Sequence, residues 1–138
     1  MAYDILFLRY FRQISEMIEK SGNVKLKDLG LTLTQGHILG YLRHKEDFTA
    51  SYKEIEAVAK VAQSSAASMI ARLEARGFVT TFTDPFDKRI KLLSITELGK
   101  DSSDASHAHM EDLQKELFAK LTEEEVQALM ESLRKITD

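Results

Sequence analysis

The stretch QSSAASMIARLEARGFVTTFTDPFDKRIKLLSI, residues 63–95, decides the fold because its residue pattern changes once, at Gly77. Before Gly77 the apolar residues recur at intervals of three and four, which is typical of an amphipathic helix. After it, residues 78–83 and 90–95 are rich in β-branched and aromatic residues, and they flank a charged tip that contains Pro85. The pattern predicts a helix followed by a β-hairpin.

The helix before Gly77 has two unlike faces. The face expected to pack on a core carries Ala66, Met69, Ile70 and Leu73. The polar face carries short donors and acceptors and one arginine, namely Gln63, Ser64, Ser65, Ser68 and Arg72. Such a helix fits the major groove of DNA, where each base pair shows its own pattern of donors and acceptors. The alternative is that the serine-rich face is only solvated.

Several shorter segments precede this helix. They are a helix over 3–20 ended by Ser21-Gly22-Asn23, a loop to Gly30, a helix over 33–44, a bridging strand over 48–50 and a short helix through Ala59. Two capping boxes, Thr32 with Gln35 and Ser51 with Glu54, predict where the second and third helices begin.

Two more helices are predicted after the hairpin. Thr96 opens a long one that runs to about Lys120, although residues 101–106, DSSDAS, have poor helix propensity and favour a break as an alternative. Thr122 with Glu125 forms a further capping box, which starts a last helix over 123–136.

The order of these elements is that of a winged helix-turn-helix. We therefore expect one mainly α-helical domain, residues 1–138, with about six helices and a small β-wing. The amphipathic segments 3–20, 110–120 and 123–136 hold more apolar surface than a small winged helix needs, so we expect N- and C-terminal helices to form a dimerisation region. Alternatively, they complete the core of a monomer.

Composition excludes several classes of function. Without cysteine the chain has no disulfide, thiolate metal site or cysteine nucleophile. It contains no Gly-x-Ser-x-Gly, no phosphate-binding glycine loop and no His-Glu-x-x-His, so we do not expect an enzyme. No signal peptide and no run of ~20 apolar residues occurs, which predicts a soluble cytoplasmic protein with no membrane partner.

The net charge of −3 is unevenly distributed. Lysine, arginine, aspartate and glutamate give +1 over residues 1–50, +2 over 51–95 and −6 over 96–138. The central segment can therefore face phosphates while the acidic end points elsewhere.

Residues 31–99 resemble the MarR family of transcriptional regulators. The similarity rests on Leu31, Thr32, Gln35 and Leu39, on Ile70, Leu73, Glu74 and Gly77, on Asp84, Asp87, Lys88 and Arg89, and on Ile95, Thr96, Glu97 and Gly99. It implies a homodimer in which residues 1–30 and 100–138 are dimerisation helices and residues 31–99 form the DNA-binding lobe. The implied function is sequence-specific, double-stranded DNA-binding transcriptional regulation, expected to be repression at a pseudo-palindromic operator.

The resemblance also assigns roles to the hairpin tip. Arg89 is expected to enter the minor groove, with Asp87 bracing it and Lys88 contacting phosphate. The chain departs from the family at Ser68, where many members carry a basic residue, and at Phe86, where they often carry arginine. These departures predict an altered sequence preference and one missing cationic contact.

Family members often bind small effectors in a cleft between the dimer helices and the DNA-binding lobe. Tyr10, His37, Tyr41 and His107 are the candidate lining residues for such an effector here. Zinc-sensing members carry an acidic ligand just before a histidine, whereas this chain has Gly36 before His37. We expect no metal and no cofactor, with a zinc-responsive regulator as one alternative.

A winged helix that binds protein instead of DNA is the other alternative, because the central segment carries little positive charge and the tip lacks one arginine.

Overall fold

The computed structural model describes residues 5–138, which fold into six α-helices and a three-stranded antiparallel sheet. The elements in chain order are α1 (Leu6–Leu26), the 3-10 helix η1 (Lys27–Leu29), α2 (Leu33–His44), β1 (Thr49–Ser51), α3 (Tyr52–Ala59), α4 (Gln63–Ala75), β2 (Val79–Thr83), β3 (Lys91–Ile95), α5 (Glu97–Leu117) and α6 (Glu123–Thr137). The predicted winged helix-turn-helix with its small β-wing is confirmed.

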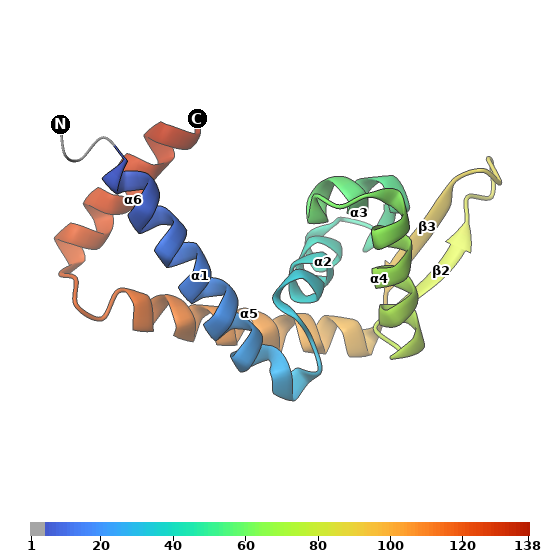
Figure 1. Ribbon diagram of the computed structural model, residues 1–138. Coiled ribbons are helices and arrows are strands. Elements are labelled where there is room, and N and C mark those ends of the chain that lie inside the picture. Colours follow the sequence, from blue (N-terminus) through green and yellow to red (C-terminus); the bar gives the residue numbers. More distant parts are fainter. Residues whose placement is uncertain (1–4) are drawn as a thin grey trace.

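The elements divide between two ends of an elongated molecule (Figure 1). Helices α2, α3 and α4 gather with the sheet at one end, and the hairpin of β2 and β3 projects from it as a wing. Helix α5 runs from the sheet past α1 toward the other end, where α6 and the beginning of α1 lie. Within residues 5–138, no helix combines the length and the apolar character needed to cross a lipid bilayer.

The core lies between the sheet and helices α2, α3 and α4. The strand order is β1-β3-β2, and β2 and β3 pair from Val79 opposite Ile95 to Thr83 opposite Lys91. The largest fully buried side chains are Leu26, Ile38, Leu39, Leu42, Ile55, Ile70, Leu73, Val79 and Leu93. Their burial fixes which face of α4 points inward.

The helix starts predicted at Thr32, Ser51, Thr96 and Thr122 are confirmed. Thr32, Ser51 and Thr122 each form a complete capping box, in which the hydroxyl accepts from a backbone N–H three residues on and the side chain at that position accepts in return. The hydroxyl of Thr96 caps α5 and also donates to the carbonyl of Gly77 at 2.6 Å. This contact joins the end of α4 to the start of α5.

The predicted end of the first helix at residues 21–23 is wrong, because α1 continues to Leu26. Gly22 is buried where a side chain would meet Leu33, and the Asn23 side chain accepts a 2.7 Å hydrogen bond from the Leu33 amide. These two residues serve helix packing instead of terminating the helix. Its predicted start at Tyr3 lies outside the described residues.

The alternative break over residues 101–106 is also wrong, because α5 is continuous from Glu97 to Leu117. Ser103 and Ser106 are buried, and a Cβ added to Gly36 would lie 2.9 Å from the Ser106 hydroxyl oxygen. Small residues are needed here so that α2 and α5 can approach closely, and this packing overrides the poor intrinsic propensity.

Candidate nucleic-acid interface

Helix α4 presents a polar face to solvent from the first turn onward. Ala66, Ile70 and Leu73 are buried on its inner side. The five polar residues selected from the sequence are all exposed, namely Gln63, Ser64, Ser65, Ser68 and Arg72. Ala62 supplies no side-chain cap, so backbone N–H groups of the first turn also point outward without a side-chain acceptor. The result is a row of donors and acceptors on a rigid support.

The wing tip is ordered by two aspartates. The Asp84 carboxylate accepts from the backbone amides of Phe86 and Asp87, at 2.7 and 3.2 Å. The Asp87 carboxylate accepts from the backbone amide of Arg89 and, through both oxygens, from the guanidinium Nε and a terminal nitrogen, each at 3.0 Å. The predicted bracing of Arg89 by Asp87 is therefore present as a bidentate pair.

Electrostatics favours this pair in its charged form. Hydrogen bonds from the side chain and backbone of Arg89 lower the pKa of Asp87, and the carboxylate in turn raises the pKa of Arg89. The Arg89 side chain is nevertheless 90% exposed. Its orientation is fixed by Asp87 while most of the guanidinium stays available to an outside acceptor.

A contact that the sequence analysis missed ties the wing to α4. Both the backbone amide and the hydroxyl of Thr81 donate to the Glu74 carboxylate, at 2.8 and 2.7 Å. Glu74 lies in the last turn of α4 and Thr81 lies in β2, seven residues away. The two surfaces selected from the sequence are thus held in a fixed relation through both backbone and side-chain contacts.

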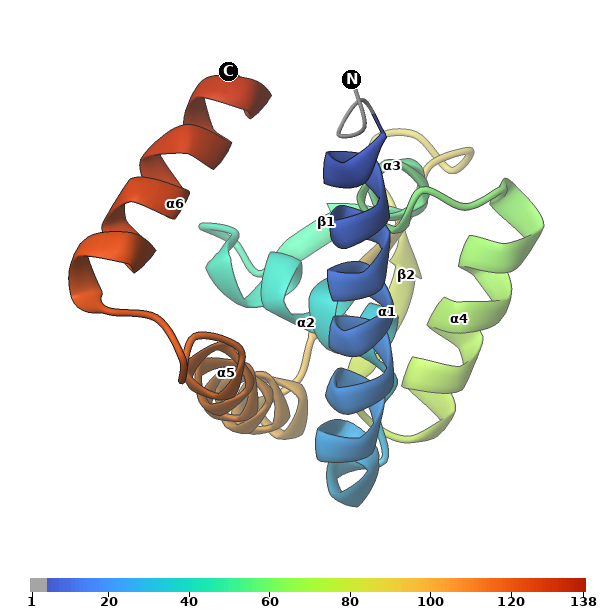
Figure 2. The same ribbon diagram turned by 60° about the vertical axis from the view of Figure 1, so that its left-hand side comes forward.

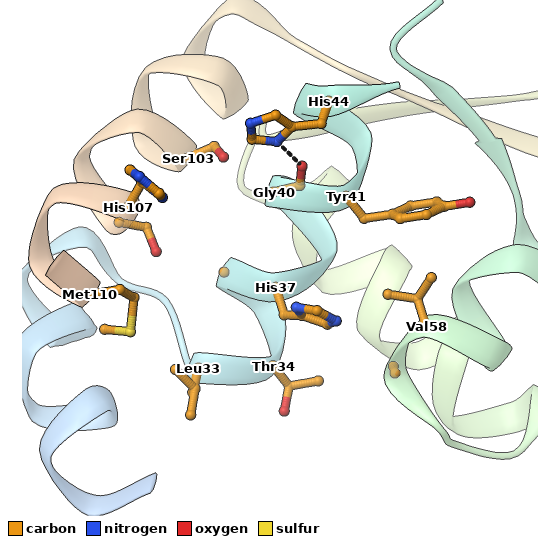
Figure 3. A pocket seen from close by; sticks show the side chains of 13 residues that line it. Leu33, Thr34, His37, Gly40, Tyr41, His44, Val58, Ser103, His107 and Met110 are labelled. Atoms are coloured by element: carbon orange, nitrogen blue, oxygen red, sulfur yellow. Dashed lines mark hydrogen bonds between the residues drawn. The ribbon is translucent and has the colours of Figure 1, made fainter. Parts of the chain in front are cut away.

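A cavity of about 690 Å³ lies along α2, with α3 and α5 as its walls (Figure 3). His37, Tyr41 and His107 line it, as do Val58 and Met110. Tyr10, the fourth candidate, lines a different cavity, formed by α1, α5 and α6. The structure therefore brings three of the four predicted effector residues together and separates Tyr10 from them.

One edge of the α2 cavity is a hydrogen-bonded group that links α2 to α3. The Glu54 carboxylate accepts from the Tyr41 hydroxyl at 2.6 Å and from the Lys45 ammonium at 2.9 Å. Burial raises the pKa of Glu54, but hydrogen bonds from Lys45, Tyr41 and the Ser51 backbone outweigh this effect, so its pKa is lowered. The same hydrogen bond to Glu54 raises the pKa of Tyr41.

The lowered pKa of Glu54 predicts a pH dependence of stability. The carboxylate stabilises the fold above the pKa it has in the unfolded chain, and this contribution is lost as pH falls through its lower folded-state pKa. Glu54→Gln should reduce the free energy of unfolding at neutral pH, with the difference from wild type shrinking as the solution becomes acidic. Urea unfolding at several pH values measures it.

Glu46→Gln, which removes an exposed carboxylate from the loop after α2, is the control for net charge. A constant difference between Glu54→Gln and wild type from neutral to acidic pH would contradict the proposed electrostatic role.

Two of the histidines make contacts within their own helices. The Nδ1 of His44 lies 2.8 Å from the Gly40 carbonyl, and His107 pairs with Glu111 at 2.9 Å on the surface of α5. In the part of the chain that the structure describes, no three histidine, aspartate or glutamate side chains gather as metal ligands.

Helices α1 and α6 stand apart from each other at the end of the molecule opposite the wing (Figure 2), and many apolar side chains of α1 and α6 are exposed. Helix α6 buries none of its residues. A groove of about 590 Å³ runs between α1, the second half of α5 and α6. Its half-exposed apolar residues include Phe7, Tyr10, Phe11, Ile14, Met17, Leu121 and Leu129. We call this surface the terminal groove.

The two-ended arrangement, with a polar helix and a braced wing at one end, defines the chain as a winged helix-turn-helix protein. Residues 31–91 of the chain match the model of the MarR family. The chain is 33% identical over 93 residues to the uncharacterized HTH-type transcriptional regulator YybA of Bacillus subtilis (strain 168), an alignment that covers 67% of this chain and 61% of the relative. The chain spans less than two thirds of the curated relatives it matches.

Solved structures agree with this assignment. The reduced form of MarR from E. coli is 28% identical, with 94% of this chain and 95% of that chain covered and a TM-score of 0.85. A mutant MarR from E. coli complexed with operator DNA is 27% identical, with 97% and 95% covered and a TM-score of 0.83. MarR-family proteins are a class of transcriptional regulators.

Proposed function

We propose that this protein is a cytoplasmic transcriptional repressor that binds a pseudo-palindromic operator in double-stranded DNA as a homodimer and has no enzymatic activity. One observation carries the proposal: the polar face of α4 and the wing that bears Arg89 are both exposed, and they belong to elements that are joined. The hydrogen bonds between Glu74 of α4 and Thr81 of β2 make this connection. The structure of MarR with operator DNA supports it as a likeness of fold and family.

The proposed contacts follow from the chemistry of each surface. The α4 residues Gln63, Ser64, Ser65 and Ser68 meet base edges and nearby phosphates in the major groove, and Arg72 meets the backbone. Arg89 enters the minor groove, where narrow A·T stretches concentrate negative potential, and Lys88 contacts phosphate.

We propose that residues 31–99 form the DNA-binding lobe and that residues 1–30 and 100–138 pair with a second copy through the terminal groove. The support is that α6 buries nothing within its own chain while its Leu129 and Leu133 line the groove. The strongly acidic segment 96–138 then lies mostly at the end away from the phosphates.

We further propose that the α2 cavity, lined by His37, Tyr41 and His107, takes a small effector that relieves repression. The cavity has the size of a small-ligand site, and its aromatic and imidazole groups suit a flat molecule with a few polar atoms. Tyr10 belongs to the terminal groove and is not part of this proposal.

A mobility-shift assay with the DNA upstream of the protein's own gene, at two salt concentrations, tests the function. A DNA-binding regulator should bind with steep salt dependence because phosphate contacts release counterions, whereas a protein-binding winged helix should show only weak retention.

In the same assay Arg89→Ala should lower operator affinity about tenfold, since a groove contact contributes ~1–3 kcal/mol. It should also reduce the salt slope by roughly one per wing. Arg89→Lys should keep the salt slope but lose affinity, because an ammonium cannot form the bidentate pair with Asp87. Unchanged affinity of Arg89→Ala, with dimerisation intact by sedimentation, would remove the wing from the interface.

A further inference from the structure

Phe86 stands out among the apolar side chains because it is 98% exposed at the very tip of the wing. The other exposed aromatic residue of the hairpin, Phe82, lies on β2 and is 44% exposed. No described part of the chain covers the Phe86 ring, so packing within the fold does not account for it. Single exposed apolar residues are common on protein surfaces. What sets Phe86 apart is its place in the same tip as the braced Arg89 guanidinium.

The turn presents the ring in a defined position. The backbone amide of Phe86 donates a 2.7 Å hydrogen bond to the Asp84 carboxylate, and Pro85 restricts the backbone immediately before it. The next residue, Asp87, holds Arg89 through the bidentate pair. One ordered turn thus carries both the exposed ring and the braced guanidinium.

We propose that Phe86 is an apolar wedge, which enters the minor groove beside Arg89 and partly unstacks one base step of the operator. The inference rests on the proposed DNA-binding function and adds to it a means of selecting sequence. Proteins that kink DNA from the minor groove combine cationic side chains in the groove with an apolar side chain inserted between two stacked bases. The wing tip carries both kinds of group. Flexible pyrimidine–purine steps are the easiest to open, so the wing selects such a step without hydrogen bonds to its bases.

The test uses the full chain and a duplex that the wild-type protein has selected from a random-sequence pool. Affinity is measured together with the fluorescence of 2-aminopurine placed, in turn, at each base protected by the wing. Phe86→Ala should weaken binding about tenfold, the order of a lost base–aromatic contact. It should also abolish the rise in 2-aminopurine fluorescence that wild type causes at one step.

Two comparisons separate the wedge from a charge effect. The salt slope should be unchanged in Phe86→Ala, because no phosphate contact is lost, whereas Lys88→Ala should lower it by roughly one per wing. Phe86→Leu should retain most of the affinity and the fluorescence rise, since leucine also serves as an apolar wedge. Replacing the pyrimidine–purine step of the duplex should weaken binding by the wild-type protein more than it weakens binding by the Phe86→Ala variant.

If wild type and Phe86→Ala bound the duplex with equal affinity and gave equal fluorescence, the proposed wedge would be overturned. The proposed DNA-binding function would still stand, because wild type binds the duplex. Reduced affinity without any fluorescence rise in wild type would overturn it as well, because the ring would then only touch the groove wall. Failure of wild type to select any duplex would instead overturn the proposed function itself.

Discussion

Ser68→Glu should lower operator affinity by at least about a hundredfold and abolish the footprint. Ser68 is exposed on the polar face of α4, opposite the buried Ala66, Ile70 and Leu73. A carboxylate there faces phosphates and base acceptors, and like-charge contacts at an interface cost several kcal/mol. Each copy in a homodimer carries the change, so the loss is incurred at both half-sites. Fluorescence anisotropy with labelled operator measures it.

The fold should tolerate this change because glutamate is at least as good a helix former as serine. Ser68→Ala is the isosteric comparison and should cost only a small factor in affinity. Ala108→Glu, at an exposed position of α5, adds the same charge outside the lobe and controls for net charge. A preserved footprint in Ser68→Glu would show that a different helix enters the major groove.

Leu129→Asp should convert the protein to a monomer and lower operator affinity by a hundredfold or more. Leu129 lines the terminal groove, and α6 buries no residue within its own chain, so an aspartate there disturbs the proposed pairing before it disturbs the monomer. A dimer that binds two half-sites at once gains ~10²–10⁴ in affinity over binding at one half-site. A monomer loses that gain. Sedimentation velocity and anisotropy measure the two effects.

Ser132→Asp places the same charge on α6 at an exposed position that does not line the terminal groove, and it should leave the dimer intact. Circular dichroism checks that the Leu129→Asp chain is still helical. A stable Leu129→Asp dimer would mean that the copies pair through another surface.

Local features of the fold were predictable from the sequence. Capping boxes such as Thr32 with Gln35 involve residues three apart, so they need no tertiary information. The inward and outward faces of α4 follow from helical periodicity, and Asp87 and Arg89 are close enough in the chain to pair within one turn.

Features that depend on packing between distant elements were not predictable. Gly22 and the serines of α5 suggested a helix end and a break because their propensity is poor, yet the structure uses their small size where helices meet. The Glu74 to Thr81 contact needs the hairpin folded beside α4. The separation of Tyr10 from His37 needs the path of α1 past α5, which no spacing along the chain reveals.

The unbroken course of α5 makes it a lever between the two ends of the molecule. Its 21 residues span about 30 Å at ~1.5 Å per residue. A tilt of roughly 6° at the end near α6 therefore displaces the opposite end by about 3 Å, close to the ~3.4 Å rise between neighbouring bases. In the proposed homodimer, a small change in how the two copies meet would thereby become a shift of about one base pair in the reach of the DNA-binding end.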